Sequence, residues 1–193
     1  GDEDPGGLVA GSYTVDVMDA DGYSQFLTVQ VQDPVPVNLN IVQQAPVLCF
    51  ENPDGYLHVQ GTGGTAPYFY YLNGSLTPNS TGIFENLSAG VYQITVEDAN
   101  NCSFLATISI TGPSQALAFS NISKNDPTCG ANNNGSINFG ATGGAQPYEF
   151  SINGGQNYQP NGSFTGLAAG TYQLKIKDAN LCVTSIEILQ LTA

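Results

Sequence analysis

The sequence predicts an all-β chain made of tandem immunoglobulin-like antiparallel β-sandwich repeats, with about seven strands in each complete repeat. A phrase of the form Leu-x-Ala-Gly-x-Tyr, followed by alternating aliphatic residues and Asp-Ala-(Asn/Asp), occurs at 8–21, 87–100 and 167–180. Residues 37–113 also align with 117–193 without a gap, at a constant offset of 80. Self-similarity at the length of a small domain predicts one fold used repeatedly.

The repeats divide the chain into three parts. We expect residues 1–36 to be the C-terminal hairpin of a preceding, incomplete repeat, and residues 37–113 and 114–193 to be two complete repeats. The linkers at 33–36 and 111–114 are short and contain proline, which predicts a semi-rigid string of domains. Because an isolated hairpin is marginal in water, we expect the rest of the first repeat to belong to a longer parent chain.

Seven strands are expected in the middle repeat, bounded by glycine, proline and asparagine. Gly63–Pro67 predicts a turn from its chain-breaking residues, and Asn73-Gly74 is a hairpin dipeptide. No helical period runs for more than a few residues. The predicted strands lie near 38–43, 45–49, 55–60, 68–72, 82–86, 91–97 and 104–111.

Residues that alternate along these strands predict the core. Tyr92, Ile94 and Val96 point inward if the strand at 91–97 has one buried face. The tyrosine follows a corner glycine on the penultimate strand, which is the position of a tyrosine corner in immunoglobulin-like folds. The other expected inward residues are Tyr172, Leu174 and Ile176; Tyr13, Val15 and Val17; Leu57 and Val59; Tyr68, Tyr70 and Leu72; and Ala106, Ile108 and Ile110.

The charge balance excludes several classes of partner. Lys124, Lys175 and Lys177 are the only basic side chains among 193 residues, and the formal net charge is -13. A nucleic-acid binder needs lysine and arginine to displace phosphate counterions, so we expect no nucleic-acid partner. Attraction to anionic lipid is disfavoured for the same reason. No apolar run approaches the roughly 20 residues of a membrane helix, so no direct membrane insertion is expected.

The four cysteines fall into two pairs with the same spacing. Cys49 to Cys102 and Cys129 to Cys182 both span 53 positions. With no Cys-x-x-Cys pattern or Cys/His cluster, zinc is disfavoured. A pair repeated once per unit predicts one disulfide within each repeat and an oxidising compartment; buried free thiols in a reduced protein are the alternative. We expect each bridge to clip one end of its sandwich.

The motifs together resemble the SprB repeat, which occurs in very long surface adhesins of gliding Bacteroidetes-type bacteria. Gly63–Tyr68 and Gly143–Tyr148 carry the Gly-Gly-x-x-Pro-Tyr part of the resemblance. Asp98–Cys102 and Asp178–Cys182 carry the Asp-Ala-Asn-x-Cys part. Tyr23 stands where the second cysteine would be in the first, incomplete repeat, which departs from the pattern.

The resemblance implies an extracellular, outer-membrane-associated protein exported by the type IX system. It implies surface attachment through a polysaccharide or another cell-surface ligand, in some members during gliding, with neighbouring repeats of the same chain as further partners. A purely structural stalk that carries another binding or enzymatic domain is the alternative. The family supplies no catalytic residues. His58 is the only histidine and has no equivalent in the other repeat, so we expect no enzyme.

Two groups of residues are candidates for binding. Asp19 and Asp98 end a strand at a hairpin turn, which predicts an Asx-type turn; calcium binding is the alternative, although calcium wants six to eight oxygens. No other cofactor is expected. Phe69 and Tyr71 point away from the core, whereas Glu149 and Ser151 replace them in the second repeat. They could stack on sugar rings; the simpler interpretation is packing under the loop at 76–81 or against a neighbouring domain.

Overall fold

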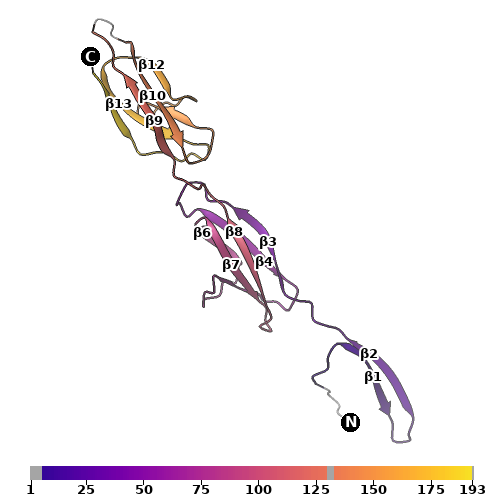
Figure 1. The fold of residues 1–193 in the computed structure, drawn as a ribbon. Helices are drawn as coiled ribbons and strands as arrows, with labels where there is room; N and C mark the ends of the chain where they lie inside the picture. The colour runs from indigo at the N-terminus through magenta and orange to yellow at the C-terminus, as the bar shows by residue number, and fades with distance from the viewer. Residues whose placement is uncertain (1–5, 130–132, 193) are drawn as a thin grey trace.

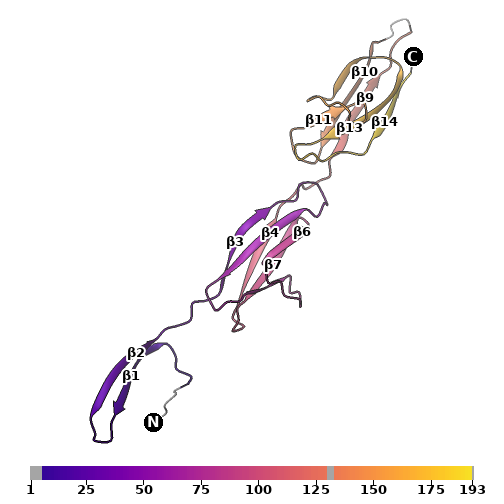
Figure 2. The same ribbon diagram turned by 180° about the vertical axis from the view of Figure 1, so that it is seen from behind.

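Strands and loops make up all of the described chain, which comprises residues 6–129 and 133–192 of a computed structural model. Alternating apolar and polar residues give fourteen strands, and no helix occurs among these residues. Figures 1 and 2 show a hairpin followed by two sandwiches in a row. The all-β repeat architecture expected from the sequence is confirmed.

The middle repeat, residues 37–113, packs two three-stranded antiparallel sheets against each other. Because it is the first of the two complete repeats, we call it the first repeat from the next section on, and residues 114–193 the second repeat. One sheet has the order β3 (Asn38–Ala45), β4 (Gly55–Thr62), β6 (Ile83–Leu87). The other has the order β5 (Phe69–Leu72), β7 (Gly90–Glu97), β8 (Ser103–Ile110). The Gln44 side chain donates to the Ser109 carbonyl across 2.7 Å, which joins β3 of one sheet to β8 of the other.

The second repeat has the same topology. Its first sheet has the order β9 (Ala118–Asn125), β10 (Gly135–Thr142), β12 (Ser163–Leu167). Its second sheet has the order β11 (Glu149–Ser151), β13 (Gly170–Lys177), β14 (Glu187–Leu191). The first five strands of each repeat begin 80 positions apart, as the gapless alignment requires. The last strand departs from this offset, because Gly90 pairs with Ile110 in β8 whereas Gly170 pairs with Leu191 in β14.

The sequence predicted seven strands per repeat, and the structure has six. The expected strand at 45–49 does not form; residues 46–49 are irregular. There, Pro46 has no N–H to donate to a ladder. The segment makes one backbone bond across the sandwich, from Val47 N to Thr111 O at 2.8 Å, and a local turn bond from Asn52 N to Cys49 O at 3.0 Å. β3 is therefore followed by a loop that extends to Asp54.

The residues predicted to point inward form the core of each sandwich. In the middle repeat Leu57, Val59, Ile94, Val96 and Ile110 are almost fully buried. Leu174 and Ile176 occupy the equivalent places in the second repeat. Burial of one such aliphatic side chain contributes about 1.5–3 kcal/mol, so these rows supply most of the driving force for each sandwich.

The tyrosine corner is confirmed in all three copies. The phenol hydroxyls of Tyr13, Tyr92 and Tyr172 donate to the backbone carbonyl four residues earlier, at 2.7, 2.9 and 2.9 Å. Each bond fixes the corner that leads into the penultimate strand. The repeated phrase at 8–21, 87–100 and 167–180 is therefore a structural motif.

The first copy of the motif lies on an isolated hairpin. β1 (Gly11–Met18) and β2 (Ser24–Val31) pair with each other alone among the described strands. Val15 is 43% exposed, whereas its equivalent Ile94 is 0% exposed. The predicted inward face of this hairpin is therefore uncovered.

In both complete repeats, a backbone hydrogen bond holds the linker that precedes the first strand, and it does so at equivalent positions. Gly64 N donates to Val35 O at 2.8 Å, and Gly144 N donates to Gln115 O at 3.0 Å, 80 positions further on. We call the end of a repeat that receives its linker the N-terminal pole, and the opposite end, where β8 or β14 finishes, the C-terminal pole. Among the described residues, no helix is long and apolar enough to span a membrane.

Candidate functional site

The aromatic pair lies on the outer face of the sheet formed by β5, β7 and β8. Phe69 pairs with Glu97 and Tyr71 with Thr95, while Tyr70 between them is buried. Both outward side chains are half-buried. On the far side of Thr95 the register places Leu105, which is 55% exposed. The face therefore presents aromatic and aliphatic side chains together.

The second repeat has a charged surface at the same place. Glu149 forms a salt bridge with Lys177, whose ammonium also lies 4.5 Å from the centroid of the Tyr158 ring. Ser151 is completely buried, and its Oγ accepts a hydrogen bond from Gly155 N at 2.9 Å. The copies therefore share their framework and differ on this outer face.

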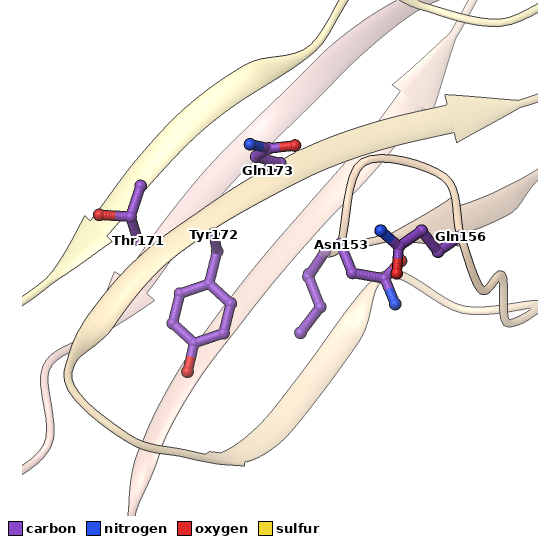
Figure 3. A pocket seen from close by; sticks show the side chains of 6 residues that line it. Asn153, Gln156, Thr171, Tyr172 and Gln173 are labelled. Atoms are coloured by element: carbon purple, nitrogen blue, oxygen red, sulfur yellow. The ribbon is translucent and has the colours of Figure 1, made fainter.

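A hollow that the sequence did not predict lies beside β13 in the second repeat (Figure 3). Its volume is about 480 Å³. Figure 3 shows Tyr172 on one side of the strand, with Thr171 and Gln173 on the other. The lining residues are Ile152, Asn153, Gln156, Thr171, Tyr172 and Gln173.

The hollow offers several amides to a ligand. Asn153 Oδ1 accepts from Asn157 N at 3.0 Å, which holds the side chain at the start of the loop. Within the described part of the chain, the amides of Gln156 and Gln173 make no side-chain hydrogen bond. Amides without a partner in the protein suit hydrogen bonds to the hydroxyls of a sugar. The signal in the sequence was that Gln156 and Thr171 replace the apolar Leu76 and Val91 of the first repeat.

The aspartates proposed as calcium ligands make Asx-type turns. Asp98 Oδ1 accepts from the backbone N–H groups of Asn100 and Cys102, each at 2.9 Å, and Oδ2 accepts from Thr65 N at 2.8 Å. The Thr65 amide, opposed by burial and aided by the other two amides, holds the pKa of Asp98 below its usual value. Asp19 Oδ1 accepts from Asp21 N and Tyr23 N.

These bonds engage both carboxylate oxygens of Asp98 and one of the two of Asp19. Among the described residues, no three His, Cys, Asp or Glu side chains cluster to hold a metal. The arrangement at Asp98 joins the turn after β7 to the turn that follows β4. Its evident role is to fix the N-terminal pole.

The predicted disulfide pairing within each repeat is wrong. Cys49 of the first repeat is bonded to Cys182 of the second, with a Cα–Cα distance of 5.7 Å, while Cys102 and Cys129 are free and exposed. Cys49 lies at the C-terminal pole of its repeat and Cys102 at the N-terminal pole, separated by the length of β8. Eight residues of strand span roughly 25 Å, whereas a disulfide needs Cα atoms within about 7 Å.

The extra strand predicted at 45–49 is compatible with a bridge within the repeat, whereas the loop found there is not. Each antiparallel strand reverses the chain, so an additional strand after β3 would return Cys49 to the same pole as Cys102. Without it, the chain runs up β3 and Cys49 stays at the far end. The equal spacing of 53 reflects the repeat itself, because any two positions in one copy recur at the same distance in the next.

Two segments of the chain match a known protein family. The SprB repeat matches residues 41–77 and 121–157, two segments whose boundaries are again 80 positions apart. SprB repeats occur in cell-surface proteins, and the family is a structural repeat, not an enzyme family. The matched segments include the first cysteine of each unit and the Gly-Gly-x-x-Pro-Tyr turn. No curated protein matches the chain.

Proposed function

Because the chain carries two SprB repeats, we propose that it is an extracellular segment of a large bacterial surface adhesin that attaches cells to surfaces, including during gliding. The observation that carries the proposal is the pair of SprB repeats placed end to end and joined covalently by Cys49–Cys182. Such an array extends contact sites away from the cell. Several weak contacts on one chain then add through avidity.

The export route and location are part of the same proposal. Type IX export and display on the outer membrane are what the family resemblance implies. Acidity supports this role indirectly, since a formal net charge of -13 keeps a long exposed array soluble and repels like-charged neighbours. The ligand class that fits the surface is a neutral polysaccharide, because only three basic side chains are available to bind an acidic one.

Two surfaces are candidates for this contact. The outer face of the first repeat offers Phe69 and Tyr71 for stacking on a sugar ring. The hollow of the second repeat offers Gln156 and Gln173 for hydrogen bonds to hydroxyls. They lie where the copies differ, which is where specificity belongs in a repeat array with a shared framework.

A purely structural stalk is the second candidate function. The disulfide between repeats favours it, because a covalent bridge at the junction restricts bending and suits a rigid spacer. The two functions differ in one measurable property: a stalk segment binds no surface ligand by itself.

A panel of neutral and acidic polysaccharides, probed with the complete 193-residue chain, separates the two. We expect binding to at least one neutral polysaccharide, and a loss of at least tenfold in affinity in the double variant Phe69→Ser/Tyr71→Ser or in Gln156→Ala/Gln173→Ala, about 1.4 kcal/mol. Leu76→Ser is the matched control, because Leu76 is 98% exposed on a loop outside both surfaces. Binding to nothing in the panel would favour the stalk.

A further inference from the structure

The junction between the repeats is held by two covalent connections. The peptide linker leaves β8 at the C-terminal pole of the first repeat and reaches β9 in the second. The Cys49–Cys182 bond crosses the same junction a second time. Beside it, the Asn180 side-chain amide donates to Leu48 O at 2.9 Å. The loop that carries Cys49 is therefore seated against the turn that carries Cys182.

Each free cysteine sits in the same local framework as one of the bonded ones. Cys102 occupies the turn after β7 as Cys182 does after β13, and Asp98 and Asp178 accept from their backbone N–H groups at 2.9 Å in both cases.

The other two cysteines also match. Cys49 follows Leu48, whose N–H donates to Asp54 Oδ1 at 3.0 Å. Cys129 follows Thr128, whose N–H donates to Asn134 Oδ1 at 2.9 Å. Both free thiols are exposed.

A cavity marks the place where a partner would sit beside Cys102. It has a volume of about 310 Å³, and its lining includes Pro34, Val37, Thr65, Asn100 and Cys102. At the equivalent turn of the second repeat, the amide of Asn180 reaches the carbonyl of Leu48 in the preceding repeat. In the first repeat the amide of Asn100 instead donates to its own Thr65 Oγ1 at 3.0 Å. The N-terminal pole of the first repeat thus has an unfilled cavity beside Cys102. At the equivalent pole of the second repeat, the loop that carries Cys49 packs beside Cys182.

We propose that Cys102 and Cys129 each form a disulfide of the same kind as Cys49–Cys182, and that each does so with a neighbouring SprB repeat of the same chain. Cys129 pairs with the cysteine equivalent to Cys182 in the repeat that follows, and Cys102 with the cysteine equivalent to Cys49 in the repeat that precedes. Every junction between two complete repeats then carries one disulfide. Each bond forms as two S–H bonds break, with two protons released and two electrons passed to a disulfide oxidant.

The bridges overlap along the chain and together form a continuous covalent path. The path enters the first repeat through the disulfide at Cys102. It then follows the backbone for 27 positions through β8, the linker and β9 to Cys129, and so crosses the junction between the two repeats. At Cys129 it crosses the following junction by disulfide. Between one bridge and the next, tension on such an array runs only along the last strand of one repeat and the first strand of the next. The remaining strands of each repeat are shielded from extension.

A chain extended by one repeat tests the proposal. A second copy of residues 114–193 is appended after Ala193, with Leu181→Asn and Cys129→Ser in the appended copy alone. The appended copy then has a single cysteine, whose peptide differs in mass, and Cys129 of the second repeat is the only cysteine at its position in the repeat. Asn is the residue the first repeat carries at the equivalent position 101, where the backbone φ is 63° against 65° at Leu181. After oxidation with a glutathione redox pair, non-reducing peptide mapping identifies the partners of each cysteine.

We expect Cys49 bonded to Cys182 and Cys129 bonded to the cysteine of the mass-tagged peptide, with Cys102 alkylated as a free thiol. Cys49→Ser should open the first junction and leave the second bond intact. Cys129 that remains free, pairs with Cys182 of its own repeat, or links two separate chains would overturn the proposal.

Discussion

Cys49 and Cys182 lie 133 positions apart in the chain and 5.7 Å apart at their Cα atoms, on opposite sides of the junction between two repeats. The bond closes a loop that contains most of both sandwiches. A disulfide within one repeat would stabilise that repeat alone, whereas this one couples two. The mechanical and thermodynamic behaviour of one repeat therefore depends on its neighbour.

The first prediction concerns extension under force. When the chain is pulled from its two ends, the intact bond should withhold the 133-position segment, roughly 450 Å of extended chain at about 3.4 Å per residue. Single-molecule force spectroscopy should show this length released in Cys49→Ser or after reduction. Cys102→Ser is the control and should leave the released length unchanged. An equal final length for the oxidised and reduced chains would contradict the pairing.

The second prediction concerns the tyrosine corner. Tyr92→Phe removes the hydrogen bond from the phenol hydroxyl to Ser88 O and should lower the free energy of unfolding of the first repeat by about 0.5–1.5 kcal/mol. Urea denaturation measures the change. Tyr56→Phe is the control, because the Tyr56 hydroxyl makes no hydrogen bond to any described residue. A cost in Tyr92→Phe no larger than in the control would show that the corner bond is not stabilising.

The third prediction compares the cost in stability of replacing two glycines by alanine. At one site only the backbone conformation is unfavourable, and at the other the added methyl group also meets a neighbouring atom. Gly74 and Gly82 have φ of 71° and 70°, but an added Cβ meets nothing within 4 Å at Gly74 and lies 2.1 Å from Val59 O at Gly82. Gly74→Ala should cost about 1–2 kcal/mol for the left-handed backbone alone. Gly82→Ala should cost a further 1–3 kcal/mol from overpacking, measured by thermal unfolding. Equal costs would mean that the close approach to Val59 relaxes freely.

The fourth prediction concerns the loss of folding stability at low pH, to which Asp98 contributes. Backbone amides, Thr65 first, hold the pKa of Asp98 below its unfolded value of about 4. A lowered folded pKa means that the stabilisation is present above pH 4 and is lost as pH falls through the folded pKa. The urea midpoint of the native chain should therefore drop as the pH falls below about 4. Asp98→Asn should show a shallower drop, and an unchanged slope would remove Asp98 from the acid response.

Much of the fold could be predicted from local pattern. The alternation at Tyr92, Ile94 and Val96 placed a strand with one buried face, and two of these three side chains are completely buried. The corner glycine and tyrosine predicted a hydrogen bond that all three copies make. These features depend on residues within a few positions of one another, so the sequence records them directly.

The candidate surfaces were only partly predictable. Phe69 and Tyr71 were assigned correctly to the outer face of a strand from their alternation with buried neighbours. The hollow beside Tyr172 was missed, because it forms where the loop after β11 lies against β13, and residues that are 20 positions apart meet there. A contact of that kind depends on sheet pairing and leaves no periodic trace in the sequence.

The sequence by itself determined that this chain is a tandem array of β-sandwich repeats, because strand periodicity, turn residues and gapless self-similarity are properties of neighbouring residues and of the repeat length. Only the tertiary structure decided which cysteines meet. Spacing along the chain does not measure distance across a sandwich, and the direction of every later strand depends on how many strands precede it. Cys49 therefore lies a full strand length from Cys102 in its own repeat, and next to Cys182 of the following repeat.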